Sequence, residues 1–192
     1  MIQKVGLAWE CPVPFIRYIE DIGITCELIT PQMMGAPYYR GKLVSLIIPT
    51  GFGNSAYSGL LPALRASSGR IRKFLNKGGR VIVFGAMSPE KDRYDWLPVP
   101  VTYVSEYFSS PVNVDEANPL ATILEDFDTS EIDCDGYIEN PEGDVLALTD
   151  DGKAIMVSYP VGEGTIIVTT IHEYPSRGFL RHFCTSESET LF

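Results

Sequence analysis

The sequence predicts a doubly wound α/β fold with a mostly parallel sheet. In its first half, short apolar segments alternate with segments whose apolar side chains recur at helical spacing. Successive strands are separated by enough residues for a crossover, and such crossovers require parallel strands with right-handed connections. The four strands are expected near residues 4–9, 24–30, 43–49 and 80–84.

The segments between these strands carry helix and turn signals. Apolar side chains at positions 15, 16, 19 and 22 share one helical face, and Gly23 then provides a C-terminal stop. Residues 31–41 are expected to form a loop or a broken helix. A helix is predicted over 60–77, with an interruption at the Ser-Ser-Gly sequence of residues 67–69 because these residues weaken a helix.

The second half of the sequence has a different pattern. Residues 92–133 are rich in proline and acidic side chains and are interpreted as an irregular insertion within a single domain of residues 1–184. Segments 144–149, 153–159 and 164–171 are separated by turn sequences, which predicts a C-terminal antiparallel hairpin. The acidic, serine-rich residues 185–192 are expected to form a flexible tail.

Composition restricts the class of protein. The chain has 192 residues, a net charge of −10 and no basic stripe, which argues against a nucleic-acid partner. No segment approaches the about 18 apolar residues of a membrane span, so no membrane partner is expected. The four cysteines are widely separated, which is typical of reduced thiols, and a cytoplasmic location is predicted.

The end of the 164–171 segment is the first candidate site. His172 and Glu173 follow a run of β-branched residues, and open α/β sheets build their sites at the carboxyl ends of strands. An imidazole beside a carboxylate suggests a base and its orienting group. Consecutive side chains of a strand point in opposite directions, so Glu173 orients His172 only if the strand has already ended. The alternatives are a histidine satisfied by a backbone carbonyl and a solvated carboxylate.

Residues 71–85, I-R-K-F-L-N-K-G-G-R-V-I-V-F-G, resemble the helix, paired glycines and strand that precede the nucleophile elbow of class I glutamine amidotransferase-like proteins. The blocks 43–87 and 144–175 carry this resemblance, which implies a flavodoxin-like fold. In that family a cysteine follows the strand. Here the elbow falls on Gly85, or on Ala86 with a shift of one residue, and neither side chain can attack a carbonyl.

The resemblance also implies a role for the loop after the third strand. Its glycines would donate backbone N–H groups to an oxyanion, and Gly51 and Gly53 occupy that place. The alternative is that both glycines permit a tight turn and that Asn54 caps the next segment. Cys11 follows the first strand, next to Glu10, and is a candidate for a relocated nucleophile, although inert thiols are commoner.

Two functions of different class follow. The favoured one is a non-catalytic amidotransferase-like domain, a pseudoenzyme without glutaminase activity, which keeps a cleft for a small molecule or acts as an assembly module. The alternative is a hydrolase of the same superfold that uses His172 with Glu10, Glu173 or Cys11, since trehalose-utilisation relatives also lack the cysteine. No cofactor or metal site is predicted, and the apolar loop at 33–39 could serve a homodimer. The expected ligand-binding residues are Gly51, Gly53, Asn54, Glu10, Gly85 and Ala86.

Overall fold

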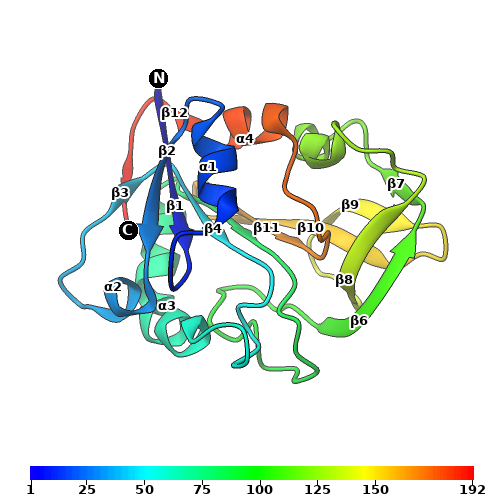
Figure 1. Cartoon of the computed structure of the whole chain (residues 1–192), viewed down its shortest axis with the longest axis horizontal. Helices are drawn as coiled ribbons and strands as arrows, with labels where there is room; N and C mark the ends of the chain where they lie inside the picture. Colours follow the sequence, from blue (N-terminus) through cyan, green and yellow to red (C-terminus); the bar gives the residue numbers. More distant parts are fainter.

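The computed structural model describes all 192 residues. A parallel sheet forms one half of the molecule (Figure 1). When the five strands of this sheet are numbered by their order along the chain, they lie side by side in the order 2-1-3-4-5, as in flavodoxin-like sheets. The four parallel strands predicted from the sequence are confirmed, and the strand before His172 lies next to the fourth of them. From one edge inward the strands are β2 (Thr25–Ile29), β1 (Ile2–Ala8), β4 (Ser45–Ile48), β5 (Arg80–Val83) and β11 (Gly164–Thr169).

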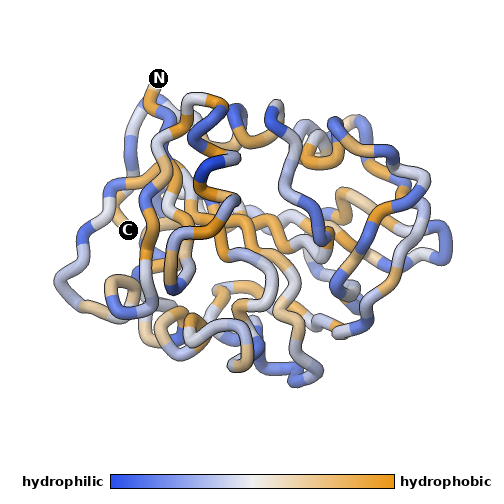
Figure 2. Tube along the Cα trace, viewed as in Figure 1, coloured by the Kyte–Doolittle hydropathy of each residue, from blue (hydrophilic) through white to orange (hydrophobic).

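Helices cover both faces of this sheet. The helices α1 (Pro14–Glu20) and α4 (Arg177–Phe183) lie on one face, and α2 (Pro31–Gly35) and α3 (Leu60–Asn76) lie on the other (Figure 1). Strand residues alternate between the two cores: Leu46 and Ile48 face α3, whereas Ile47 faces α1 and α4. Figure 2 shows that hydrophobic residues follow these central strands, while hydrophilic ones concentrate in the outer loops.

The expected interruption of α3 is wrong. The helix runs without a break through residues 67–69 because Ser67 is buried and its hydroxyl donates to the Met34 carbonyl of α2 at 2.6 Å. A tertiary contact therefore outweighs the weak helix propensity of the Ser-Ser-Gly sequence. None of the helices combines the length and the apolar character that crossing a membrane would need.

The second half of the chain extends the sheet with antiparallel strands. β10 (Ala154–Val161) pairs with β11, β9 (Asp144–Thr149) and β8 (Ile132–Ile138), and β8 pairs in turn with β6 (Tyr103–Ser110). β7 (Val112–Val114) pairs with β9, and a 3-10 helix, η1, covers Pro119–Leu124. Residues 92–133 are therefore not an irregular insertion. The strand β6 escaped prediction because it is an edge strand whose side chains are mostly exposed and polar.

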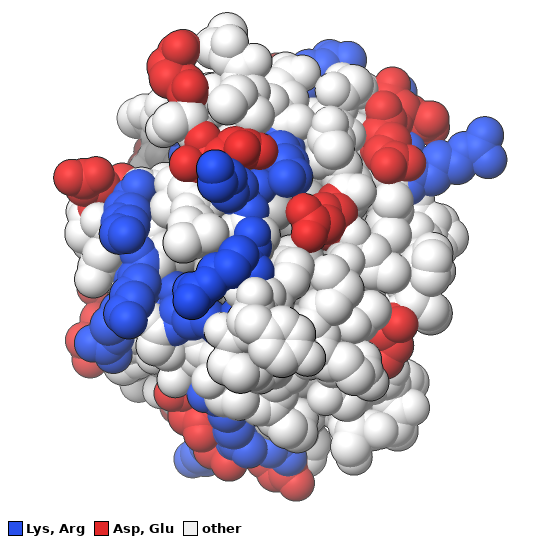
Figure 3. Space-filling view, turned by 90° about the vertical axis from the view of Figure 1, so that its left-hand side faces the viewer, with Lys and Arg blue, Asp and Glu red and all other residues white.

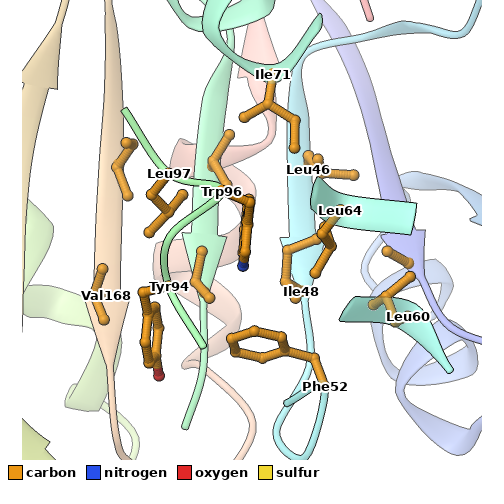
Figure 4. Packing of buried hydrophobic residues seen from close by; sticks show 14 of the residues in the cluster. Leu46, Ile48, Phe52, Leu60, Leu64, Ile71, Tyr94, Trp96, Leu97 and Val168 are labelled. Carbon is orange, nitrogen blue, oxygen red and sulfur yellow. The ribbon is translucent and has the colours of Figure 1, made fainter. Parts of the chain in front are cut away.

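The segment between β5 and β6 also belongs to the core. Tyr94 and Trp96 are each 2% exposed, and their rings meet Phe52 edge to face at 5.3 and 5.8 Å. Figure 4 shows Trp96 beside Ile48 and Leu64, with Tyr94 next to Val168. The loops after β4 and β5 are thereby packed against each other at the carboxyl end of the parallel strands.

The final residues are paired rather than free. β12 (Thr185–Ser186) pairs with β1, and β13 (Thr190–Leu191) pairs with β3 (Lys42–Leu43), both antiparallel. Phe192 is 2% exposed and its ring lies 5.8 Å from that of Phe74. The flexible tail expected over 185–192 is corrected accordingly, because a single buried aromatic ring and two short ladders hold it against the sheet.

Candidate functional site

His172 lies just beyond β11, at the carboxyl end of the parallel sheet. Its side chain is 51% exposed, and its Nδ1 is 2.9 Å from Oδ1 of Asp135, whose side chain is fully buried. An ionised carboxylate only accepts hydrogen bonds, so Nδ1 carries the proton of this bond. In the neutral form of the imidazole, Nε2 is then the acceptor, in the orientation that Asp135 sets.

Asp135 itself is held by three further hydrogen bonds. Its Oδ2 accepts from the Thr50 hydroxyl at 3.0 Å, its N–H donates to the Thr170 carbonyl at 2.7 Å, and its carbonyl accepts from the Tyr103 hydroxyl at 2.5 Å. These partners lie at the ends of three strands: Thr50 follows β4, Thr170 follows β11 and Tyr103 begins β6. The strand β8, which carries Asp135, reaches them because it runs beside the end of β11. The main chain of Asp135 is therefore fixed to the ends of β11 and β6, and its carboxylate to the end of β4.

The partner predicted for His172 was Glu173, and that pairing is wrong. Glu173 follows His172 directly and makes no hydrogen bond to it, whereas Asp135 lies 37 residues away on β8. The Oε2 atom of Glu173 is buried and has no hydrogen-bond partner. The sequence offered one weak signal for Asp135, which is an acidic residue between the apolar positions 132, 134 and 138 of a strand.

The space above Gly85, where the elbow side chain was expected, is filled by Asp135. A Cβ atom on Gly85 would lie 2.8 Å from Cβ of Asp135 and 3.4 Å from its Oδ2. Met87, two residues further on, has a φ of +51°, a conformation that residues other than glycine seldom adopt. The sharp turn of the chain thus lies at Met87 rather than at Gly85 or Ala86.

Backbone N–H groups of this turn are already engaged. The Ala86 N–H donates to the Tyr94 hydroxyl at 3.1 Å and the Met87 N–H to the Tyr103 hydroxyl at 3.4 Å. Burial raises the pKa of both tyrosines, so their hydroxyls keep their protons and donate onward to main-chain carbonyls. A ligand at this turn would have to displace a tyrosine to reach either N–H.

The glycine loop after β4 is engaged in the same way. The Gly51 N–H donates to the Gly85 carbonyl at 2.8 Å, and the Gly53 N–H donates to the Ala86 carbonyl at 3.2 Å. Gly51 has a φ of +89°, which favours glycine, and Asn54 Nδ2 donates to the Met87 carbonyl at 3.0 Å. These contacts join the two loops and support the tight-turn interpretation of Gly51, Gly53 and Asn54.

Two other expected site residues lie apart from His172. Glu10 accepts hydrogen bonds from the Ser58 hydroxyl and the Gly59 N–H, so its carboxylate holds the start of α3. Cys11 is exposed and lines neither of the two hollows beside His172. Of the predicted residues, the structure therefore brings only His172 and Glu173 to one hollow, where they meet Thr50.

The first hollow has a volume of about 300 Å³ and mostly apolar walls. The Phe15 and Tyr174 rings are stacked at 4.2 Å with an interplanar angle of 5°, which stiffens one wall. A second, more open hollow of about 620 Å³ shares His172, Glu173 and Tyr174 with the first. The remaining walls of the first hollow are Trp9, Val13, Pro14, Pro49, Thr50 and Phe84.

Charge is unevenly distributed over the molecule. Figure 3 shows Lys and Arg side chains gathered on one part of the face that carries the β2 edge of the sheet, with Asp and Glu beside them. Lys4, for example, pairs with Glu27 at 3.5 Å and with Glu189 at 3.6 Å. The first hollow has no Lys or Arg in its walls. No three His, Cys, Asp or Glu side chains are arranged to hold a metal ion.

Comparisons with known proteins identify the fold. No protein-family model and no curated protein matches the sequence. A protein from Thermoplasma acidophilum, described as a candidate subunit of GMP synthase, has a similar structure, with a TM-score of 0.61 and 14% identity over 96% of this chain and 93% of that one. At this identity the likeness concerns the fold, and it fits the α/β fold with a mostly parallel sheet that the sequence predicts.

Two further structures resemble the chain less closely. A cytoplasmic protein from Salmonella typhimurium LT2 gives a TM-score of 0.52 and 14% identity over 94% of this chain and 95% of that one. An exo-β-1,4-mannosidase from an Opitutaceae bacterium gives 0.52 and 12%, over 89% of this chain and 31% of the mannosidase. At these identities the likeness concerns the fold alone, and the chain corresponds to about a third of the mannosidase.

Proposed function

We propose that the chain is a non-catalytic glutamine amidotransferase-like domain that binds a small molecule in the first hollow, beside His172. The observation that carries the proposal is the turn after β5: its residues Gly85, Ala86 and Met87 carry no nucleophilic side chain, and the Asp135 side chain occupies the space over Gly85. Acyl transfer needs a nucleophile within reach of a base and free donors for the oxyanion. Gly85, Ala86 and Met87 offer no nucleophile, and the nearby N–H groups are engaged.

The hollow itself supports binding. Small-molecule sites are concave, mostly apolar and supplied with a few convergent polar groups, and they start at about 300 Å³. The first hollow has about that volume, and its polar side chains Thr50, His172 and Glu173 meet at the carboxyl end of the sheet. Asp135 fixes two of these three, so the site is formed before any ligand arrives.

A ligand screen tests the proposal. The purified chain is screened against a library of metabolites by thermal unfolding, and each hit is repeated with His172→Ala. Loss of one hydrogen bond costs about 0.5–1.5 kcal/mol, or up to about 3 kcal/mol with a charged partner, so affinity should fall several-fold to about a hundredfold. His182→Ala, on the exposed face of α4, is the matched control and should leave affinity unchanged.

Two results would contradict the proposal. The first is ammonia release from glutamine above a buffer control, since no acyl-transfer nucleophile is expected. The second is a screen whose hits bind wild type and His172→Ala equally, because the ligand would then lie elsewhere. If His172→Ala also melts at a much lower temperature without ligand, the His172–Asp135 pair stabilises the fold rather than a ligand.

A hydrolase is the second candidate, and one observation favours it. A buried carboxylate that holds an imidazole through Nδ1 leaves Nε2 placed to accept a proton from water, as in a general base. In this version Asp135 replaces Glu10, Glu173 and Cys11 as the partner of His172. Turnover of a panel of ester and amide substrates that is lost in His172→Ala, but kept in His182→Ala, would favour the hydrolase over the binding domain.

A further inference from the structure

We propose that the ligand of the first hollow is a small organic cation that carries N–H donors, such as an amidinium or a primary ammonium group on a ring or short chain. The inference rests on the proposed function and specifies its ligand class. It follows from the hydrogen-bonding roles that Asp135 imposes on its neighbours, from the unpaired oxygen of Glu173 and from the aromatic walls.

Asp135 turns both of its side-chain partners into acceptors. His172 uses its Nδ1 proton toward Oδ1, so the neutral form of its ring offers the lone pair of Nε2 to the hollow. Thr50 uses its only hydroxyl proton toward Oδ2, so its oxygen offers lone pairs alone. A ligand that touches these two groups must therefore donate hydrogen bonds.

Glu173 adds a third acceptor and a negative charge. Glu173 lines both hollows, and its Oε2 is buried without a hydrogen-bond partner. A buried acceptor that lacks a partner is costly, and a donor supplied by a ligand would satisfy it. The first hollow has no Lys or Arg side chain, and Arg177, which lines the second hollow, lies over the Tyr18 ring at 5.2 Å.

The apolar walls suit the body of such a ligand. Trp9, Phe15, Phe84 and Tyr174 line the first hollow, and aromatic faces attract cations within about 6 Å of the ring centroid. The chain as a whole has a net charge of −10, which favours the approach of a cation over that of an anion. The apolar walls, the hydrogen-bond acceptors and the negative charge thus all favour an organic cation that carries N–H donors.

Four probes of similar size separate the contributions. Benzamidine is a cation with N–H donors, benzamide is neutral, benzoate is an anion, and phenyltrimethylammonium is a cation without donors. Titration calorimetry on the full chain should show benzamidine binding about tenfold or more tighter than benzamide, since a charge-assisted hydrogen bond is about twice as strong as a neutral one. Benzoate should not bind measurably, and phenyltrimethylammonium should bind more weakly than benzamidine.

Variants assign the effect to the hollow. Glu173→Gln should weaken benzamidine about tenfold and leave benzamide within about twofold, because the variant keeps the shape of the side chain and one accepting oxygen but removes the charge. Glu163→Gln, at an exposed turn between β10 and β11, is the matched control and should change neither. Thermal unfolding of each variant in the absence of probes confirms that it is folded.

The outcomes distinguish this inference from the proposed function. If benzamide or benzoate binds as tightly as benzamidine and loses affinity in His172→Ala, the hollow is a ligand site but the cation inference is overturned. If benzamidine binds and Glu173→Gln changes nothing, the inference is overturned as well. If no probe binds at millimolar concentration, the inference is rejected, and the metabolite screen alone decides whether the hollow binds anything.

Discussion

Replacing Gly85 by alanine tests the central claim about the filled elbow. The added Cβ would lie 2.8 Å from Cβ of Asp135 and 3.4 Å from the Tyr103 hydroxyl oxygen. Neither Asp135, which is held by hydrogen bonds at both carboxylate oxygens, nor the backbone of β8 can move away freely. Overpacking of this kind costs about 1–3 kcal/mol, which for a chain of this size lowers the melting temperature by about 2–12 °C.

The control is Gly69→Ala in α3. Gly69 is exposed, a Cβ there would meet nothing within 4 Å, and alanine is favoured over glycine in a helix by about 1 kcal/mol, so the melting temperature should rise by about 2–4 °C. Gly85 does not have a positive φ, so a loss of stability at that position would be steric. A Gly85→Ala variant as stable as wild type would show that Asp135 does not fill this space, and an elbow side chain would then have room at this position.

Two further predictions concern titrating groups. Cys11 is exposed and should react at once with a thiol reagent such as DTNB at pH 8. The other three thiols should react more slowly, because burial raises their pKa to about 12 and leaves about one part in ten thousand as thiolate; the two that are fully buried, Cys134 and Cys184, should react only on unfolding. The slow thiols are those of Cys26, Cys134 and Cys184. The Thr149 hydroxyl donates to Asp151 and holds the pKa of that carboxyl below its ordinary value of 3.8, so the stabilisation is present above pH 3.8 and is lost as the pH falls through the lower, folded-state pKa. The free energy of urea unfolding should therefore fall less steeply with acid in Asp151→Asn than in wild type, and identical slopes would contradict this assignment.

Local sequence patterns account for the parallel half of the fold. Its central strands are short apolar runs between turns or helices, because burial on both faces removes polar alternation from strands such as β4. The edge strand β2 instead alternates polar and apolar side chains. The strand β6 could not be predicted in this way, because it borders the sheet on one side only and exposes Glu106 and Tyr107. Its place is set by pairing with β8, which local pattern does not encode.

The same reasoning predicted one member of the His172–Asp135 pair and missed the other. His172 was found because it ends a buried strand at the sheet edge where sites form. Asp135 was missed because its role depends on β8 running beside β11, and an acidic residue inside a strand is usually interpreted as solvent-facing. Gly51 illustrates a third case, in which the conformation was anticipated but the proposed oxyanion role was not supported, since its N–H is bonded to the Gly85 carbonyl.

The roles that Asp135 imposes lead to a last prediction, for Asp135→Asn. An asparagine has one accepting oxygen and one donating nitrogen, so it cannot accept from both the Thr50 hydroxyl and His172. If its oxygen keeps Thr50, its nitrogen donates to Nδ1, and the imidazole must then carry its proton on Nε2. The variant should bind benzamidine at least tenfold more weakly, because His172 would present a donor to a donor. Nitrogen-15 chemical shifts of the His172 ring should report the exchange of the protonated nitrogen directly. An unchanged tautomer with unchanged benzamidine affinity would refute the role of Asp135, whereas a changed tautomer with unchanged affinity would leave the Asp135 pair intact and remove His172 from contact with the ligand.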